Sequence, residues 1–185
     1  MRWATYFLIC VLFFQELTAG VKDFKINGIA LNDSLLNHFS EQEIEYSLEM
    51  MENELKDYEG GQHKKKYSKF FFSEDKFRKL GEYTILEVAF KKNDKKLKAK
   101  YVSGMKPVKN KSTCKANREK RIIKAKKTLR AIKINRLEIG SHDWAILNTN
   151  GEHLAWMICS DKYLKVSVMY RDYLLFIRKN SSFLK

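Results

Sequence analysis

Residues 144–178 read WAILNTNGEHLAWMICSDKYLKVSVMYRDYLLFIR, and they carry the clearest strand pattern of the chain. Short apolar runs with a two-residue alternation, separated by polar turn residues, are typical of neighbouring antiparallel strands. Asn150-Gly151 favours a tight hairpin turn, and Arg171-Asp172 offers a second short connection. The stretch therefore predicts an antiparallel meander of four strands at Trp144–Leu147, His153–Ser160, Leu164–Tyr170 and Tyr173–Arg178.

The middle of the chain repeats this kind of pattern. Three further strands are expected at Tyr67–Ser73, Tyr83–Lys91 and Lys96–Ser103. The last two flank the polar turn Lys92-Asn93-Asp94-Lys95 and would form a hairpin. Pro107 then interrupts the extended pattern, because proline lacks the amide hydrogen that a strand ladder needs.

Two helices are expected, one before each group of strands. Ser40 and Glu43 have the spacing of a capping box, in which each side chain bonds the backbone amide of the other residue. Apolar residues follow on one helical face, at Ile44, Leu48, Met51, Leu55 and Tyr58, up to the glycine pair Gly60-Gly61. The second helix is expected from Ser112 to Arg136, with a core-facing stripe of Cys114, Ile122, Ala125, Leu129 and Ile132.

Runs of strands after each helix indicate the α+β class, with two amphipathic helices packed on one face of an antiparallel sheet. The expected order is leader-α-βββ-α-ββββ, which suggests two similar halves although no residue-level repeat is visible. The 185 residues are 44% hydrophobic and contain one proline, so the composition excludes a disordered chain. We expect a single domain over residues 20–185 that enters through an extended segment at residues 22–31.

The first nineteen residues have the features of a secretory signal peptide. Arg2 gives a positive start, Trp3–Phe14 is uncharged and apolar, and Ala19 offers a cleavage position before Gly20. The apolar run is shorter than the about 20 residues that span a membrane, although a retained anchor stays an alternative. We expect an exported protein, periplasmic or secreted after cleavage near Ala19.

Cleavage would remove Cys10 and leave two cysteines, Cys114 and Cys159. An even pair in an exported protein predicts one disulfide, whereas two buried free thiols are the alternative. Closing this loop would restrict the unfolded chain by roughly 4 kcal/mol. The bond would join the second helix to its own sheet.

The net charge of +14 is concentrated in one part of the chain. Residues 91–136 hold nineteen Lys and Arg against two acidic residues, whereas residues 33–59 hold nine acidic residues and one lysine. The basic segment could be a solvated face, or it could bind an anionic envelope surface, a protein or nucleic acid. Base stacking has little support because Tyr101 is the only aromatic residue in the segment. The candidate binding residues on the second helix are Lys120, Arg121, Lys124, Lys127 and Arg130.

Three consecutive aromatic residues, Phe70, Phe71 and Phe72, give the second candidate binding site. Side chains alternate between the two faces of a sheet, so at least one of these rings must point away from the helix layer. Either another part of the chain or a partner would cover it.

Two groups of residues permit an enzymatic alternative. Ser34 follows Asp33 and precedes Leu35 as in Gly-Asp-Ser-Leu hydrolases, but Asn32 replaces the glycine and no Asp-x-x-His follows near the C-terminus. His142 and His153, with Asp143, could form a metal site across a hairpin. Both signals are weak, and the sequence indicates no cofactor.

Residues 24–44, FKINGIALNDSLLNHFSEQEI, resemble the opening of a family of small uncharacterised exported bacterial proteins. The shared motif is Ile-x-Gly-Ile-x-Leu-x-Asp-Ser-Leu-Leu, followed by an acidic helix, and this chain departs from it at Asn32. The resemblance implies export and a shared fold, and it implies no activity. We therefore expect a non-enzymatic exported domain that binds a protein or an anionic envelope surface; a hydrolase and a basic nucleic-acid-binding protein are the alternatives.

Overall fold

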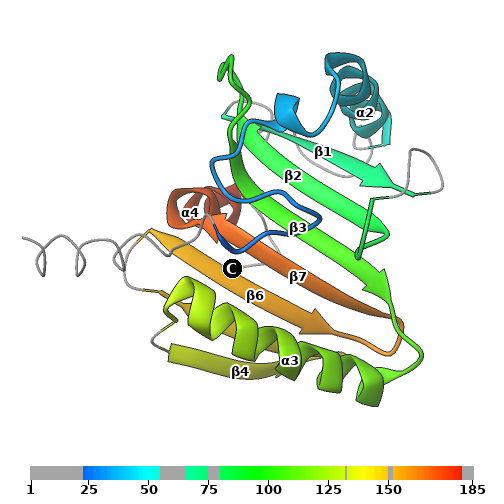
Figure 1. Ribbon diagram of the computed structural model, residues 1–185, viewed down its shortest axis with the longest axis vertical. Helices are drawn as coiled ribbons and strands as arrows, with labels where there is room; N and C mark the ends of the chain where they lie inside the picture. Colours follow the sequence, from blue (N-terminus) through cyan, green and yellow to red (C-terminus); the bar gives the residue numbers. More distant parts are fainter. Residues whose placement is uncertain (1–22, 55–65, 75–79, 132, 150–151, 181–185) are drawn as a thin grey trace, which may run out of the picture.

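A computed structural model describes residues 23–54, 66–74, 80–131, 133–149 and 152–180 (Figure 1). A seven-stranded sheet carries helices on both faces. The helices are a short 3-10 turn at Leu35–Asn37, α2 at Glu41–Glu54, α3 at Lys111–Leu129 and α4 at Arg171–Asn180. The strands are β1 Tyr67–Ser73, β2 Ile85–Lys91, β3 Ala99–Pro107, β4 Lys133–Ile139, β5 His142–Asn148, β6 His153–Cys159 and β7 Tyr163–Tyr170.

All strand pairs in the sheet are antiparallel, in the order β1-β2-β3-β7-β6-β5-β4. The meander β4–β7 therefore joins the meander β1–β3 at the contact between β3 and β7, where Val102 lies opposite Val168. This arrangement leaves β1 and β4 at the two edges of the sheet.

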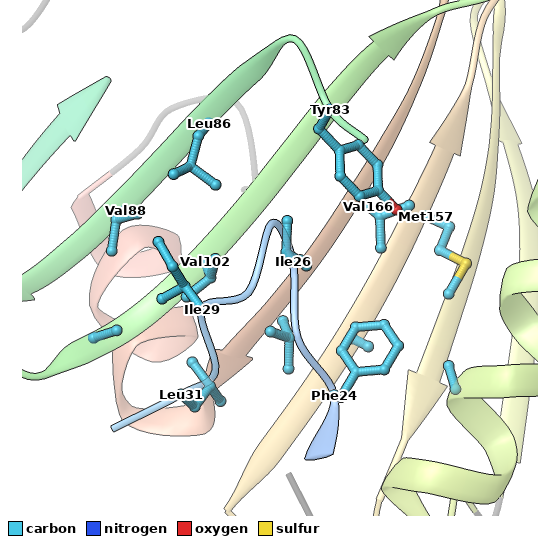
Figure 2. Packing of buried hydrophobic residues seen from close by; sticks show 14 of the residues in the cluster. Phe24, Ile26, Ile29, Leu31, Tyr83, Leu86, Val88, Val102, Met157 and Val166 are labelled. Atoms are coloured by element: carbon cyan, nitrogen blue, oxygen red, sulfur yellow. The ribbon is translucent and has the colours of Figure 1, made fainter. Parts of the chain in front are cut away.

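One face of the sheet is covered by α2, by the segment that precedes it and by α3 (Figure 1). Phe24, Ile26, Ile29 and Leu31 lie over the centre of this face, against side chains such as Val102 (Figure 2). A tight turn at Asn27-Gly28, with φ of 48° and 85°, brings Ile26 and Ile29 into a two-residue bridge. The entry segment is thus a third layer of the core between the two helices.

The opposite face carries α4, which packs on a separate apolar cluster. Its members are Tyr67, Ala89, Tyr101, Leu154, Met169 and Tyr173. Tyr173 from α4 meets the rings of Tyr67 and Tyr101 at centroid distances of 5.0 and 5.2 Å. The two clusters together bury both faces of the central strands.

The predicted α+β class, the antiparallel sheet and the disulfide between Cys114 and Cys159 are confirmed. The strand at Tyr67–Ser73 has the bounds that the sequence predicts. The capping box is also present, because the Glu43 amide donates to the Ser40 hydroxyl and the Ser40 amide donates to the Glu43 carboxylate.

Two predicted elements are wrong. Residues 173–178 belong to helix α4 and not to a strand, because Tyr173, Phe176 and Ile177 share one helical face that packs on the second cluster. The second helix ends at Leu129, where Arg130 takes a left-handed conformation, and residues 133–139 form the strand β4. The sheet therefore has seven strands, as expected, but β4 takes the place of the predicted strand at residues 173–178. That predicted strand is the third helix, α4.

Several predicted features lie outside the described residues, namely the leader at 1–19, the glycine pair at 60–61 and the turn at 150–151. Within the described part of the chain, every helix is too short or too polar to cross a membrane.

Candidate binding surface

The N-terminal end of α3 is held in place by a side-chain cap and a covalent bond. Asn110 caps the helix by accepting a hydrogen bond of 2.8 Å from the Thr113 amide. One residue later, Cys114 forms the disulfide with Cys159 at the end of β6, with their Cα atoms 5.6 Å apart. The helix is therefore anchored to the sheet within its first turn.

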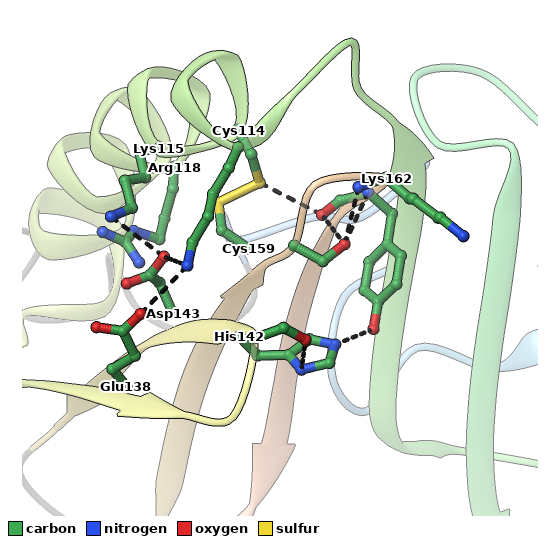
Figure 3. A network of polar contacts seen from close by, with 12 residues as sticks. Cys114, Lys115, Arg118, Glu138, His142, Asp143, Cys159 and Lys162 are labelled. Carbon is green, nitrogen blue, oxygen red and sulfur yellow. Dashed lines mark hydrogen bonds and ion pairs between the residues drawn. A yellow bond between two sulfur atoms is a disulfide. The ribbon is translucent and has the colours of Figure 1, made fainter.

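The basic residues of this end also find acidic partners on β4 and β5 (Figure 3). Lys111 lies 3.1 Å from Asp143 and 3.2 Å from Glu138, and Lys115 lies 3.2 Å from Asp143. Hydrogen bonds to Asp143 and Glu138 raise the pKa of Lys111. Burial raises the pKa of Asp143, but its bonds to both lysines outweigh burial and leave the pKa below its ordinary value. The positive charge of this half is largely neutralised within the protein.

The second half of α3 presents its lysines to solvent. Ile122, Ala125 and Leu129 face the core, so the opposite side of the helix points outward. That side carries four exposed lysines around the side chain of Ile123, which is 71% exposed. We call this surface the basic patch, formed by Lys120, Ile123, Lys124, Lys126 and Lys127. Among the described residues, none of these four lysines forms an ion pair.

Two of the sequence candidates on α3 differ from the patch lysines. Arg121 pairs with Glu82 and lies 5.7 Å above the ring of Tyr83. Burial lowers the pKa of Arg121 and raises the pKa of Tyr83 to about 12. Arg121 is therefore part of the packing between α3 and the sheet and is not a free binding residue. Arg130 is exposed at the end of the helix, where its left-handed backbone ends the helical turn.

The three phenylalanines of β1 divide between the two faces of the sheet. Phe70 and Phe72 are fully buried against Phe39 of the entry segment, with ring centroids 5.8 and 4.1 Å away. Phe71 faces the other side and is half-buried, while its backbone is bonded to Ser47 of α2. Only Phe71 of the three thus offers ring surface to a partner.

The structure gives Ser34 a structural hydrogen bond. Its hydroxyl donates to the carbonyl of Lys96 at 2.8 Å, which ties the entry segment to the loop between β2 and β3. The neighbouring Asp33 accepts from the Ala30 amide and lies 3.5 Å from His38. The Ser34 hydroxyl therefore donates to a backbone carbonyl, which cannot serve as the base that activates a serine nucleophile.

The residues of the hypothetical metal site do not converge. His142 bonds the hydroxyl of Tyr163 on the face that carries α4, whereas Asp143 lies on the opposite face between Lys111 and Lys115. His153 lies against Tyr170 at the start of β6, whereas Asp143 lies beside Cys159 at the end of that strand. Within the described ranges, no group of three or more His, Cys, Asp and Glu side chains could hold a metal ion.

Comparisons with protein-family models, with curated proteins and with solved structures found no match for this chain. The family resemblance of residues 24–44 therefore stays a prediction.

The sequence did not single out Ile123 or Lys126, although both lie on the outward side of α3. A helical projection of residues 120–127 is the signal that could have found Ile123, since residues 120, 123, 124 and 127 share one face. Lys126 lies beside that face, and its exposure is seen only in the structure. The edge strand β4 could not be found this way, because the helical pattern predicts a helix up to Arg136, which includes the first four residues of β4.

Proposed function

We propose that this protein is a non-catalytic exported domain that binds an anionic membrane surface of the cell envelope through the basic patch on α3. The observation that carries the proposal is the division of α3 into two halves. The first half has its cations paired with Asp143 and Glu138, and the second half directs four exposed lysines outward.

The geometry suits a surface ligand better than a small molecule. The lysines lie side by side on the exposed side of one helix, so phosphates spread over a plane can contact several of them at once. Each Lys near an anionic bilayer contributes about 1 kcal/mol. The exposed side chain of Ile123 lies among the lysines and would reach the acyl boundary when they contact headgroups.

Two further features support the proposal. A buried disulfide suits an oxidising compartment, in agreement with the predicted leader. Neither candidate for catalysis is arranged for chemistry, because Ser34 bonds a carbonyl and His142 and Asp143 lie on opposite faces.

Vesicle binding tests the function directly. The wild-type protein should sediment with vesicles that contain 30% phosphatidylglycerol and remain in solution with vesicles of phosphatidylcholine alone. Replacing Lys120, Lys124 and Lys127 by Gln should weaken binding by about 100-fold, because three lysines contribute roughly 3 kcal/mol.

The matched control changes three lysines on another surface. Lys92, Lys95 and Lys96 are exposed in the loop between β2 and β3, and their replacement by Gln alters the net charge by the same amount. This control should keep most of the binding. Equal losses in both triple variants would show that net charge alone drives adsorption, and the proposed function would then be wrong.

A further inference from the structure

The two edge strands of the sheet, β1 and β4, differ in how their outer backbone groups are covered. At the β1 edge, the Ser47 hydroxyl of α2 donates to the Phe71 carbonyl at 2.7 Å and accepts from the Phe71 amide at 3.0 Å. These bonds occupy backbone groups that would otherwise pair with another strand, and α2 covers the edge. The β1 edge is therefore closed to strand addition.

The β4 edge is open within the described part of the chain. β4 is the last strand of the sheet, and its outer side pairs with no described residue. In an antiparallel pair every second residue directs its amide and carbonyl away from the partner strand, so β4 offers a row of unpaired groups. These groups can accept an additional strand.

The second half of β4 is apolar on one face of this edge, whereas Lys133 and Asn135 occupy the first half of the same face. Leu137 and Ile139 are 46% and 54% exposed, on the face of the sheet opposite α3. Leu137 lies across from Trp144 of β5, whose ring meets Trp156 at 5.8 Å. An added strand with apolar side chains on this face would extend the tryptophan surface and cover both exposed residues.

The other face of the same edge carries ion pairs, among them one with Glu138 of β4 itself, and a net excess of one positive charge. Arg136 is exposed on β4 and bonds Glu119 at 2.7 Å, and Lys111 and Lys115 of α3 reach over β4 and β5. Around them, the four cations Lys111, Lys115, Arg118 and Arg136 exceed the three acids Glu119, Glu138 and Asp143. Acidic side chains of an added strand would therefore be favoured on this face.

We infer that β4 is a docking edge for an extended segment of a partner protein in which apolar and acidic side chains alternate. The segment adds an eighth strand to the sheet, with its apolar side chains over Leu137 and Ile139 and its acidic side chains beside Arg136. Backbone hydrogen bonds give affinity and the two faces give specificity. This edge is separate from the basic patch, so the inference does not depend on the proposed function.

Calorimetric titration with a synthetic peptide tests the inference. The probe is acetyl-Val-Glu-Val-Glu-Val-Glu-Val-amide, which matches the seven residues of β4 and should bind the purified protein measurably. The same peptide with Lys in place of Glu should bind at least about tenfold more weakly. Two N-methylated versions of the Glu peptide, one for each set of alternate amides, distinguish strand addition from unspecific adsorption. Only one set of amides can face β4, so methylation of that set should abolish binding and methylation of the other set should not.

Variants of the protein locate the peptide. Leu137→Glu should weaken binding at least tenfold, whereas Leu175→Glu introduces the same charge at a more exposed leucine on α4 and should leave peptide binding unchanged. Arg136→Glu should reverse the preference between the Glu and Lys peptides. Unchanged thermal unfolding of each variant shows that the fold is intact.

Three outcomes would overturn the inference. The first is no binding of the Glu peptide at 1 mM, roughly −4 kcal/mol of binding free energy. The second is equal binding of both N-methylated peptides. The third is a wild-type dimer that Leu137→Glu converts to a monomer, since the edge would then hold a second copy of the chain.

Discussion

Gly104 is a residue whose missing side chain shapes the core. A Cβ atom at this position would lie 2.5 Å from Cγ of Tyr83 and 2.7 Å from Cγ2 of Ile26. Both neighbours are almost completely buried, so neither can move into solvent. The glycine in the centre of β3 thus allows the entry segment to approach the sheet closely.

Gly104→Ala should lower the free energy of unfolding by about 1–3 kcal/mol, because a methyl group is forced into a filled space. Urea unfolding measures the change. Combining it with Tyr83→Ala, which vacates the space, should make the cost of Gly104→Ala smaller than in the wild-type background. Additive costs in the double variant would contradict this packing.

Glu87 is the centre of a polar group on the face that carries α4. Its side chain is 13% exposed, accepts from Lys165 at 3.0 Å and accepts from the Tyr101 hydroxyl at 2.8 Å. Burial raises the pKa of Glu87, but the charges of Lys165 and Lys69 outweigh burial and bring the pKa below its ordinary value. A carboxylate with a lowered pKa stabilises the fold at neutral pH and loses that contribution as pH falls through the folded-state value.

Glu87→Gln should therefore lower the free energy of unfolding by about 2–4 kcal/mol at pH 7, because Lys165 keeps a partly buried charge without its partner. The difference from wild type should begin to shrink as pH falls below the ordinary carboxyl range of about 4.3, and it should vanish once pH lies below the lowered pKa of the folded wild-type carboxyl. Denaturant unfolding at a series of pH values measures both effects. Glu45→Gln, an exposed change on α2, should cost less than about 0.5 kcal/mol at every pH.

At the scale of elements, the sequence predicts best where local chemistry is explicit. The capping box placed the start of α2, and β1 has the predicted bounds because polar residues surround its aromatic run. The end of α3 lacked such a signal, since Arg130 and not a glycine takes the left-handed position with φ of 48°. The sequence pattern therefore predicts a helix that continues to Arg136, into the residues that form β4.

The C-terminal helix was missed for a different reason. Residues 173–177 are five consecutive apolar residues, and such a run fits a buried strand as well as a helix. The aromatic cluster of Tyr67 and Tyr101 on the sheet decides between them, and those residues are distant in sequence.

Of the candidate binding surface, the basic segment at residues 91–136 can be found from the sequence. The ion pair of Arg121 cannot, because its partner Glu82 lies far away in the sequence.

The disulfide is the element-scale contact with the largest expected effect. It closes a loop over a sequence separation of 45 residues and joins α3 to β6. Reduction should lower the free energy of unfolding by about 4 kcal/mol, a loss that unfolding in the presence and absence of dithiothreitol measures. The double variant Cys114→Ser, Cys159→Ser should be insensitive to the reductant. A wild-type protein that unfolds identically under both conditions would contradict a stabilising role for this bond.

Considered as a whole, the molecule has an uneven charge distribution. The acidic helix α2 lies over β1, and α3, which carries the basic patch, lies over the other end of the sheet (Figure 1). The seven strands divide into three and four around the junction of β3 and β7, and an origin from two similar halves stays a prediction. The separation of charge gives the protein a dipole that can orient it toward an anionic surface.

Salt should therefore affect binding and stability in opposite directions. Raising sodium chloride from 10 to 150 mM shortens the Debye length from about 30 to about 8 Å, which should weaken vesicle binding at least tenfold. The same change should raise the melting temperature of the free protein, because it screens the self-repulsion of a chain with net charge +14. Sedimentation and circular dichroism measure the two effects, and a melting temperature that falls with salt would contradict the second.

The one-sided anchoring of α3 has a consequence for its motions. The Asn110 cap and the disulfide at Cys114 fix the first turn, whereas non-covalent contacts hold the rest of the helix. These are the apolar contacts of Ile122, Ala125 and Leu129 and the ion pairs of Glu119 and Arg121. Local opening should therefore begin at the end that carries the lysines, and amide hydrogens there should exchange with deuterium faster than those near Cys114. A bound vesicle should slow amide exchange at that end selectively, so exchange rates in the second half of α3 would measure the fraction of protein bound to the membrane.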